Sequence, residues 1–249
     1  MQIVIIGSGN VAYHLAKAFV LSSIPVAQIF GRNEGELRNI SEELQIPFST
    51  ERLSDADLYI ICVSDHSVRD VSKLINNKNC LVAHTSGSLS KEILMGSYRK
   101  ASFYPLQTFS KSKDLKYSDI PFFIEAENEN DYKMLFDTAS KISGNVMEST
   151  YEKRKYIHLT AVFACNFVNH LFSRAKEISD SQEIPFDYFL PLIDETVQKI
   201  HQIEPKSAQT GPAVRNDTRI LEIHEQLLKD ESLEIYKTMN HSIQKMYEL

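Results

Sequence analysis

Ile3-Val-Ile-Ile-Gly7-Ser-Gly9-Asn-Val-Ala12 is the stretch of sequence that decides the fold. It joins a short apolar strand to a turn of the form G-x-G-x-x-A, and residues 14–21 after it have the apolar spacing of a helix. In such a unit the first glycine permits a tight turn, the second lets backbone approach a pyrophosphate, and the small alanine lets helix and strand touch. An ordinary strand-to-helix turn is the alternative. The stretch predicts a dinucleotide site whose contacts are Gly7, Ser8, Gly9, Asn10 and Val11.

The rest of the chain divides into two halves of different character. Up to residue 150, short apolar runs alternate with amphipathic stretches, which indicates βαβ units and a Rossmann-type, doubly wound, mostly parallel sheet. From residue 151 to 249 the strand signal is absent, and four helical stretches predict an all-α domain. The expected strands are 2–6, 26–30, 46–48, 58–63, 81–84, 101–104, 122–125 and 145–147. We expect two domains, 1–150 and 151–249, with a substrate cleft between them.

The residues after the second predicted strand indicate which dinucleotide is bound. Proteins that prefer NAD place an acidic residue there to accept from the ribose 2′-hydroxyl, whereas this chain has Gly31-Arg32-Asn33. A guanidinium can pair bidentately with a 2′-phosphate, and Asn33 can donate a further hydrogen bond. Alternatively, Arg32 is a loop residue that contacts only solvent. We therefore expect NADP(H) as the cofactor.

Polar residues also follow the fourth and fifth predicted strands, at the sheet edge where open α/β folds bind ligands. Val63, Ser64 and Asp65 come after the fourth strand, and they could line the nicotinamide ribose, although Asp65 could instead cap the next helix. His84 and Ser86 come after the fifth strand. His84 could be satisfied in the core, but its place at a strand end favours a role in the site.

The helical half carries its own polar candidates. Residues 158–178 have the apolar background of a central helix with little solvent contact, and against it Asn166, Asn169, His170 and Ser173 form one polar stripe. The stripe would either hydrogen-bond another helix or line a wet cleft. In the loop of residues 209–217, Arg215 could bind a substrate carboxylate or form an ion pair that holds the loop, and Asp217 is placed to cap the next helix.

Composition and charge narrow the possible partners. The formal net charge of −6 argues against a nucleic-acid partner, and the longest apolar runs are too short for a membrane span. Cys62, Cys80 and Cys165 form no CxxC pair, and we expect three buried thiols in a reducing cytoplasm. The eight histidines show no ligand spacing, so no metal is expected. A small molecule is the expected partner.

With these motifs assembled, the chain resembles the NADP-binding superfamily of pyrroline-5-carboxylate reductase, β-hydroxyacid dehydrogenases and 6-phosphogluconate dehydrogenase. It more closely resembles Rossmann-like NADP oxidoreductases with a helical C-terminal domain of unknown function. That second likeness rests on three segments, His84–Ser88, Tyr104–Phe109 and Thr210–Asp217. The resemblance implies a homodimer joined through the C-terminal helices, and a cleft faced by Tyr104–Phe109, with Gln107 as a substrate contact.

The resemblance also exposes a difference. β-Hydroxyacid dehydrogenases carry a K-x-x-N-N pattern whose lysine is the general acid or base, and the corresponding run here is Asn166-Phe-Val-Asn169-His170, without a lysine. Ketone chemistry would then need His170 or His84 as a substitute, whereas reduction of a protonated imine needs mainly positioning by groups such as Asn166 and Ser86. Two hypotheses follow: an NADP(H)-dependent oxidoreductase acting on a small imino or oxo acid, or a non-catalytic NADP(H)-binding sensor or scaffold.

Overall fold

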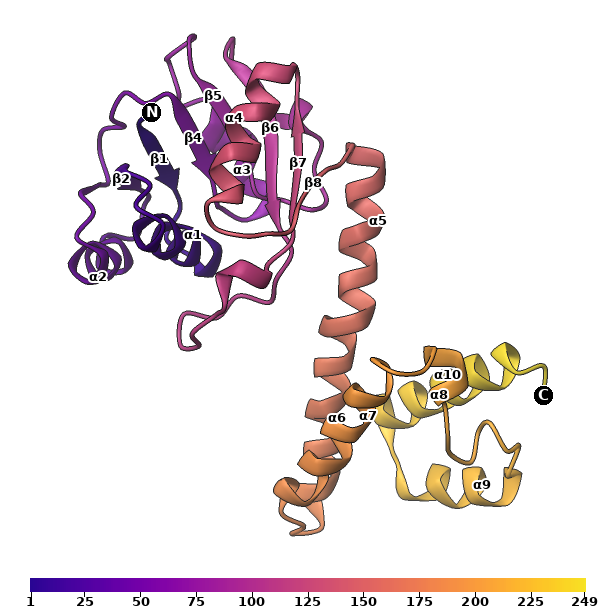
Figure 1. Cartoon of the computed structure of the whole chain (residues 1–249). Helices are drawn as coiled ribbons and strands as arrows, with labels where there is room; N and C mark the ends of the chain where they lie inside the picture. Colours follow the sequence, from indigo (N-terminus) through magenta and orange to yellow (C-terminus); the bar gives the residue numbers. More distant parts are fainter. The chain divides into compact units, whose positions relative to one another are not determined.

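The computed structural model describes all 249 residues, and they form two compact units, Met1–Asn166 and Phe167–Leu249. The first unit holds the sheet and the helices that cover it, and the second is helical (Figure 1). The boundary between the units lies inside a helical segment that begins at Tyr151. A functional division at residue 151 stays a prediction.

The first unit is built on one eight-stranded sheet in the order β3-β2-β1-β4-β5-β6-β7-β8. All neighbouring strands are parallel except β6 and β7, which pair antiparallel. The predicted doubly wound, mostly parallel sheet is therefore confirmed. The strands are β1 (Ile3–Ile6), β2 (Val26–Phe30), β3 (Phe48–Ser49), β4 (Leu58–Ile61), β5 (Leu81–His84), β6 (Arg99–Pro105), β7 (Phe122–Ala126) and β8 (Val146–Glu148).

Helices cover both faces of this sheet because alternate residues of its buried strands point to opposite sides. On one face, Ile3 and Ile5 of β1 belong to the same core as apolar residues of α1 (Asn10–Leu21), α2 (Glu34–Leu44) and α4 (Glu129–Ser140). On the other face, Val4 and Ile6 pack with Val68 of α3 (Asp65–Ser72). Because β1, β4 and β5 are parallel, their carboxyl ends lie at one edge of the sheet, where the turns that follow them form a site.

A long helical segment leaves the sheet and enters the second unit. It consists of α5 (Tyr151–Ala161), a π-helical turn (Val162–Phe167) and α6 (Val168–Ser181). The expectation of little solvent contact is wrong for the single chain, because Leu159 and Phe163 are 49% and 62% exposed. The expectation of three buried thiols is also wrong, since Cys165 in the π-helical turn is exposed whereas Cys62 and Cys80 are buried.

The remaining helices belong to the second unit. They are α7 (Leu190–Lys199), α8 (Pro205–Ala208), α9 (Thr218–Leu227) and α10 (Asp230–Met246). Short 3-10 helices also occur at Lys91–Ile93, Tyr117–Asp119 and Phe186–Phe189. None of the helices combines the length and the apolar character needed to cross a membrane.

Candidate functional site

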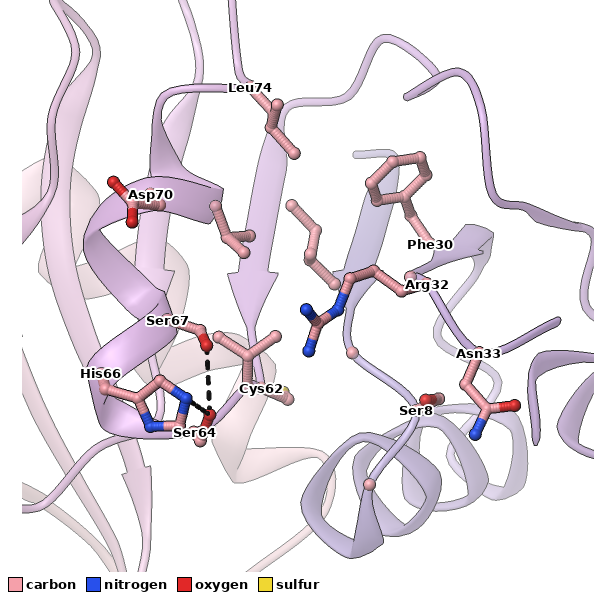
Figure 2. Close-up of a pocket in the computed structure, with 16 residues that line it drawn as sticks. Ser8, Phe30, Arg32, Asn33, Cys62, Ser64, His66, Ser67, Asp70 and Leu74 are labelled. Carbon is pink, nitrogen blue, oxygen red and sulfur yellow. Dashed lines mark hydrogen bonds between the residues drawn. The ribbon is translucent and has the colours of Figure 1, made fainter.

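A pocket of about 700 Å³ opens at the carboxyl edge of β1, β2 and β4. Its walls come from the turn after β1, the turn after β2, the end of β4 and one side of α3 (Figure 2). Its polar and glycine lining consists of Gly7, Ser8, Gly9, Gly31, Arg32, Asn33, Ser64, His66, Ser67 and Asp70. Sequence reasoning identified most of these turns, and it missed the contribution of α3.

The turn after β1 has the geometry that a pyrophosphate site needs. Gly7 adopts φ +137°, and a Cβ there would lie 2.4 Å from the carbonyl oxygen of Cys62, so no other residue fits. A Cβ on Gly9 would meet nothing within 4 Å, which leaves its backbone open to a ligand. The first turn of α1 carries no acidic residue and no side-chain cap, so its backbone N–H groups remain available to an anion. The structure therefore presents a helix N-terminus suited to phosphate.

The turn after β2 brings a cation to the same pocket. Arg32 is exposed, and its guanidinium extends into the pocket in the direction of β4 and α3 (Figure 2). No hydrogen bond or ion pair within the protein occupies this guanidinium. Asn33 caps α2, because its side-chain oxygen accepts from the backbone N–H of Glu36 at 3.2 Å. That bond leaves the side-chain NH₂ of Asn33 to donate elsewhere.

The connection between β6 and β7 lies against the dinucleotide turn. The sequence pattern does not reveal this contact. Asn10 donates from its side chain to the carbonyl oxygen of Phe109 at 2.9 Å. Lys111 donates to the carbonyl oxygen of Ser8 at 2.8 Å and also pairs with Glu36 of α2. A cation from a distant part of the chain thus ties the turn after β1 to the first turn of α2.

At the end of β4, hydroxyl groups and an imidazole gather at the pocket wall. The Oγ atom of Ser64 lies 3.3 Å from Nε2 of His66 and 3.2 Å from Oγ of Ser67. Ser64 is the residue that precedes α3, while Asp65 is the first residue of that helix, so the expectation that Asp65 caps α3 is wrong. Val63 and Ser64 line the pocket and Asp65 is outside it.

The turn after β5 is built around a buried histidine. His84 is fully buried, and its Nδ1 accepts from the backbone N–H of Ser86 at 3.2 Å. Burial, together with the nearby charge of Arg154, lowers the pKa of His84 to about 4, so the ring is neutral near pH 7. The Oγ atom of Ser86 in turn accepts from the backbone N–H groups of Ser88 and Leu89. His84 therefore stabilises this turn through its hydrogen bond to Ser86 and does not contact solvent.

A pair of polar side chains lies beside that turn, of which the sequence analysis named Tyr104, in the segment Tyr104–Phe109, but not its partner His158. Tyr104, near the end of β6, places its hydroxyl oxygen 2.9 Å from Nδ1 of His158 on α5. One turn earlier on α5, the fully buried Arg154 pairs with Glu125 of β7 at 2.6 Å and donates to the carbonyl oxygen of Leu89 at 2.6 Å. Apolar periodicity could not locate these contacts, because they join polar residues far apart in the sequence.

The other predicted candidates are exposed. Asn166 lies in the π-helical turn, and His170 on α6 lies 3.4 Å from Nε of Arg174. Arg215 forms no ion pair, so the structure does not show the predicted loop-holding role, whereas Asp217 caps α9 as expected. Gln107 is exposed in the connection after β6, and its side-chain oxygen accepts from the backbone N–H of Thr108. Their roles toward a substrate stay predictions.

Comparisons with known proteins agree with this geometry. Residues 2–85 match the family model "NADP oxidoreductase coenzyme F420-dependent", and residues 120–243 match a domain of unknown function, DUF2520. The solved structure of BF3122 from Bacteroides fragilis, which is named as an NADP oxidoreductase, is similar over 98% of both chains, with 37% identity and a TM-score of 0.93. No curated protein gives a significant match.

More distant solved structures share the fold. The reductive aminase of Aspergillus terreus, solved with NADPH and ethyl levulinate, is 12% identical with a TM-score of 0.74, over 98% of this chain and 94% of that chain. A pyrroline-5-carboxylate reductase from Coxiella burnetii is 13% identical with a TM-score of 0.57, over 97% of both chains. At these identities the likeness concerns the fold alone.

Proposed function

This chain belongs to an NADP oxidoreductase family and carries an F420-dependent-type oxidoreductase domain followed by DUF2520, and we propose that it reduces a small imino or oxo acid, or oxidises the corresponding product. NADP(H) is the cofactor of this family, and the residues of the pocket fit it. Bound NADPH supplies the hydride for the reduction. The chain itself must bind the cofactor, orient the substrate and transfer a proton.

One observation carries the proposal: the pocket combines the Gly7–Gly9 turn with Arg32, a cation unpaired within the protein. The N–H groups at the start of α1 suit the pyrophosphate, and the guanidinium of Arg32 suits a phosphate on the adenosine ribose. No acidic residue occupies positions 31–33, where it would repel that phosphate. Ser64 and Ser86 follow β4 and β5, at the edge where the nicotinamide half of a dinucleotide binds in this fold class.

The proposed substrate side uses the exposed polar residues that follow the sheet. Arg215 and Gln107 would hold a carboxylate and a neighbouring polar atom, since a guanidinium pairs bidentately with a carboxylate. Asn166 and His170 would orient the carbonyl or imine group. His84 is buried and neutral, so we assign it to the support of Ser86.

The predicted cleft between the two halves stays a prediction, as do the cytoplasmic location and the homodimer joined through the C-terminal helices. Sedimentation at the mass of a single chain would contradict the dimer.

A substrate panel tests this function. Purified protein is mixed with NADPH and a series of 2-oxo acids and cyclic imines, while the absorbance of the reduced nicotinamide is followed. We expect turnover of at least one class, lowered about 10-fold to 1000-fold by Asn166→Ala and by His170→Ala, with NADPH affinity unchanged. NADPH binding without turnover of any panel member would contradict the proposal and favour a non-catalytic NADP(H)-binding protein.

A further inference from the structure

A row of polar residues crosses the sheet on the face that carries α3. His84 of β5, Ser102 of β6 and Glu125 of β7 are neighbours in the strand registers, so their side chains lie side by side. Tyr104 lies two residues beyond Ser102 and therefore on the same face, closer to the carboxyl end of β6. This places Tyr104 at the edge where the turns after β1, β4 and β5 also lie.

The start of α5 covers this polar row. Arg154 and His158 are four residues apart and so share one face of the helix. Arg154 is fixed by its buried ion pair with Glu125, and His158 is thereby held above the hydroxyl of Tyr104, with ring centroids 5.9 Å apart in an edge-to-face arrangement. The turn after β5 makes room for the imidazole, because a Cβ on Gly87 would lie 2.7 Å from the Cβ of His158. Three separate elements therefore position this ring.

The chemistry of the pair sets which nitrogen of His158 carries a proton. Burial raises the pKa of Tyr104 to about 12, so its hydroxyl stays protonated near neutral pH and can donate to Nδ1. In the neutral imidazole the proton then sits on Nε2, and that nitrogen is directed away from Tyr104. His158 is only partly buried, whereas Tyr104 is 7% exposed. Nε2 is thus the atom of the pair that can meet a ligand.

We propose that His158 is the proton donor of the oxidoreductase reaction and that Tyr104 is the positioning residue that orients it. The pair takes the place of the lysine that is absent from the run Asn166–His170. It belongs to the unit that contains the dinucleotide turn, unlike His170, and it is less enclosed than His84. This inference rests on the proposed function and deepens it, because a proton donor extends the substrate class from iminium ions to oxo acids.

The reduction adds one hydride and one proton to the substrate. The substrate carbon receives the hydride that NADPH supplies, and the electron pair of the C=O or C=N double bond moves to the oxygen or nitrogen. That atom forms its new bond to the proton released by protonated His158 from Nε2. In protonated His158, Nδ1 also carries a proton and donates it to the hydroxyl oxygen of Tyr104, which keeps its own proton. After Nε2 has released its proton the ring is neutral with its proton on Nδ1, and Nε2 regains a proton from solvent. The charged groups around the pair are Arg154 on α5, Asp65 on α3 and Glu125 on β7.

Two measurements on the full chain test the assignment. In ¹⁵N-histidine-labelled protein, we expect the His158 signals to be those of an Nε2–H ring that accepts at Nδ1, to change in Tyr104→Phe, and to shift when NADP⁺ binds. In the substrate panel, His158→Gln should lower turnover of oxo acids about 100-fold to 10,000-fold while leaving NADPH affinity within about twofold. Tyr104→Phe should lower turnover less and move the pH profile. His241→Gln, an exposed residue of α10, is the matched control.

Each result has one meaning for the proposal. NADP⁺ binding that leaves the His158 signals unchanged, or turnover that His158→Gln retains, overturns this assignment while the proposed function stands. If the wild-type protein binds NADPH but turns over no panel member, the proposed function fails and this assignment fails with it. Preserved NADPH affinity in both variants shows that they remain folded.

Discussion

At the scale of single residues, the structure gives neighbouring polar groups very different environments. Arg32 is exposed in the pocket with no partner, whereas His84 is fully buried behind the turn after β5. Both were predicted as site residues from their places after strands, and position in sequence could not distinguish exposure from burial. The difference arises because His84 is the last residue of a strand whose side chains are buried on both faces.

The burial of His84 predicts how stability depends on pH. Its folded-state pKa of about 4 lies below the value of about 6.5 expected in the unfolded chain. Between these two values the unfolded chain binds more protons, so the free energy of unfolding falls as the pH drops from about 6.5 to about 4, by up to about 3 kcal/mol from this residue. Urea unfolding of wild type and His84→Gln at pH 7 and pH 4.5 measures the effect. We expect a smaller loss in the variant, and an equal loss in both would contradict the burial of a neutral ring.

At the scale of elements, the connection between β6 and β7 supports the cofactor turn. Lys111 bonds to Ser8 and pairs with Glu36, a carboxylate three residues beyond Asn33. Without Lys111, the negative charge of Glu36 would repel a bound 2′-phosphate. His14 of α1 holds the same connection, since its two ring nitrogens lie 2.8 Å from the hydroxyl of Tyr117 and from the carbonyl oxygen of Ser110.

Lys111→Met should therefore weaken NADPH binding about threefold to tenfold and NADH binding less, because NADH lacks the 2′-phosphate. Fluorescence titrations at two salt concentrations measure both affinities. Lys113→Met is the matched control, since Lys113 is an exposed lysine of the same connection. In the double variant with Glu36→Gln, the loss should become smaller. Equal losses for NADPH and NADH would show that Lys111 acts only on the shape of the turn.

The elements themselves could largely be predicted from the sequence, and their contacts could not. Buried strands such as Leu58–Ile61 are continuous apolar runs, and the turn at Gly7 requires a glycine that the sequence displays. The bond from Lys111 to Ser8 and the pair of Tyr104 with His158 join residues that are distant in sequence and carry no periodic signal. The π-helical turn that contains Asn166 is likewise invisible to a pattern that assumes regular α-helical spacing.

At the scale of the whole molecule, the two units differ in how completely each one buries its apolar side chains. The sheet unit encloses a large core, whereas the helical unit leaves Tyr188, Leu192 and Leu227 exposed by 74%, 64% and 75%. Exposed apolar side chains of this size are typical of surfaces that meet another chain. The proposed homodimer through the C-terminal helices would bury such side chains.

The central claim is that the chain binds NADP(H) at the Gly7–Gly9 turn, with Arg32 reading the 2′-phosphate. Isothermal titration of wild type and Arg32→Ala with NADPH and with NADH tests it most directly. We expect the wild type to prefer NADPH, and Arg32→Ala to weaken NADPH binding about 10-fold to 100-fold while NADH affinity changes little. Equal affinities of the wild type for NADPH and NADH, or an NADPH affinity that Arg32→Ala leaves unchanged, would contradict the claim.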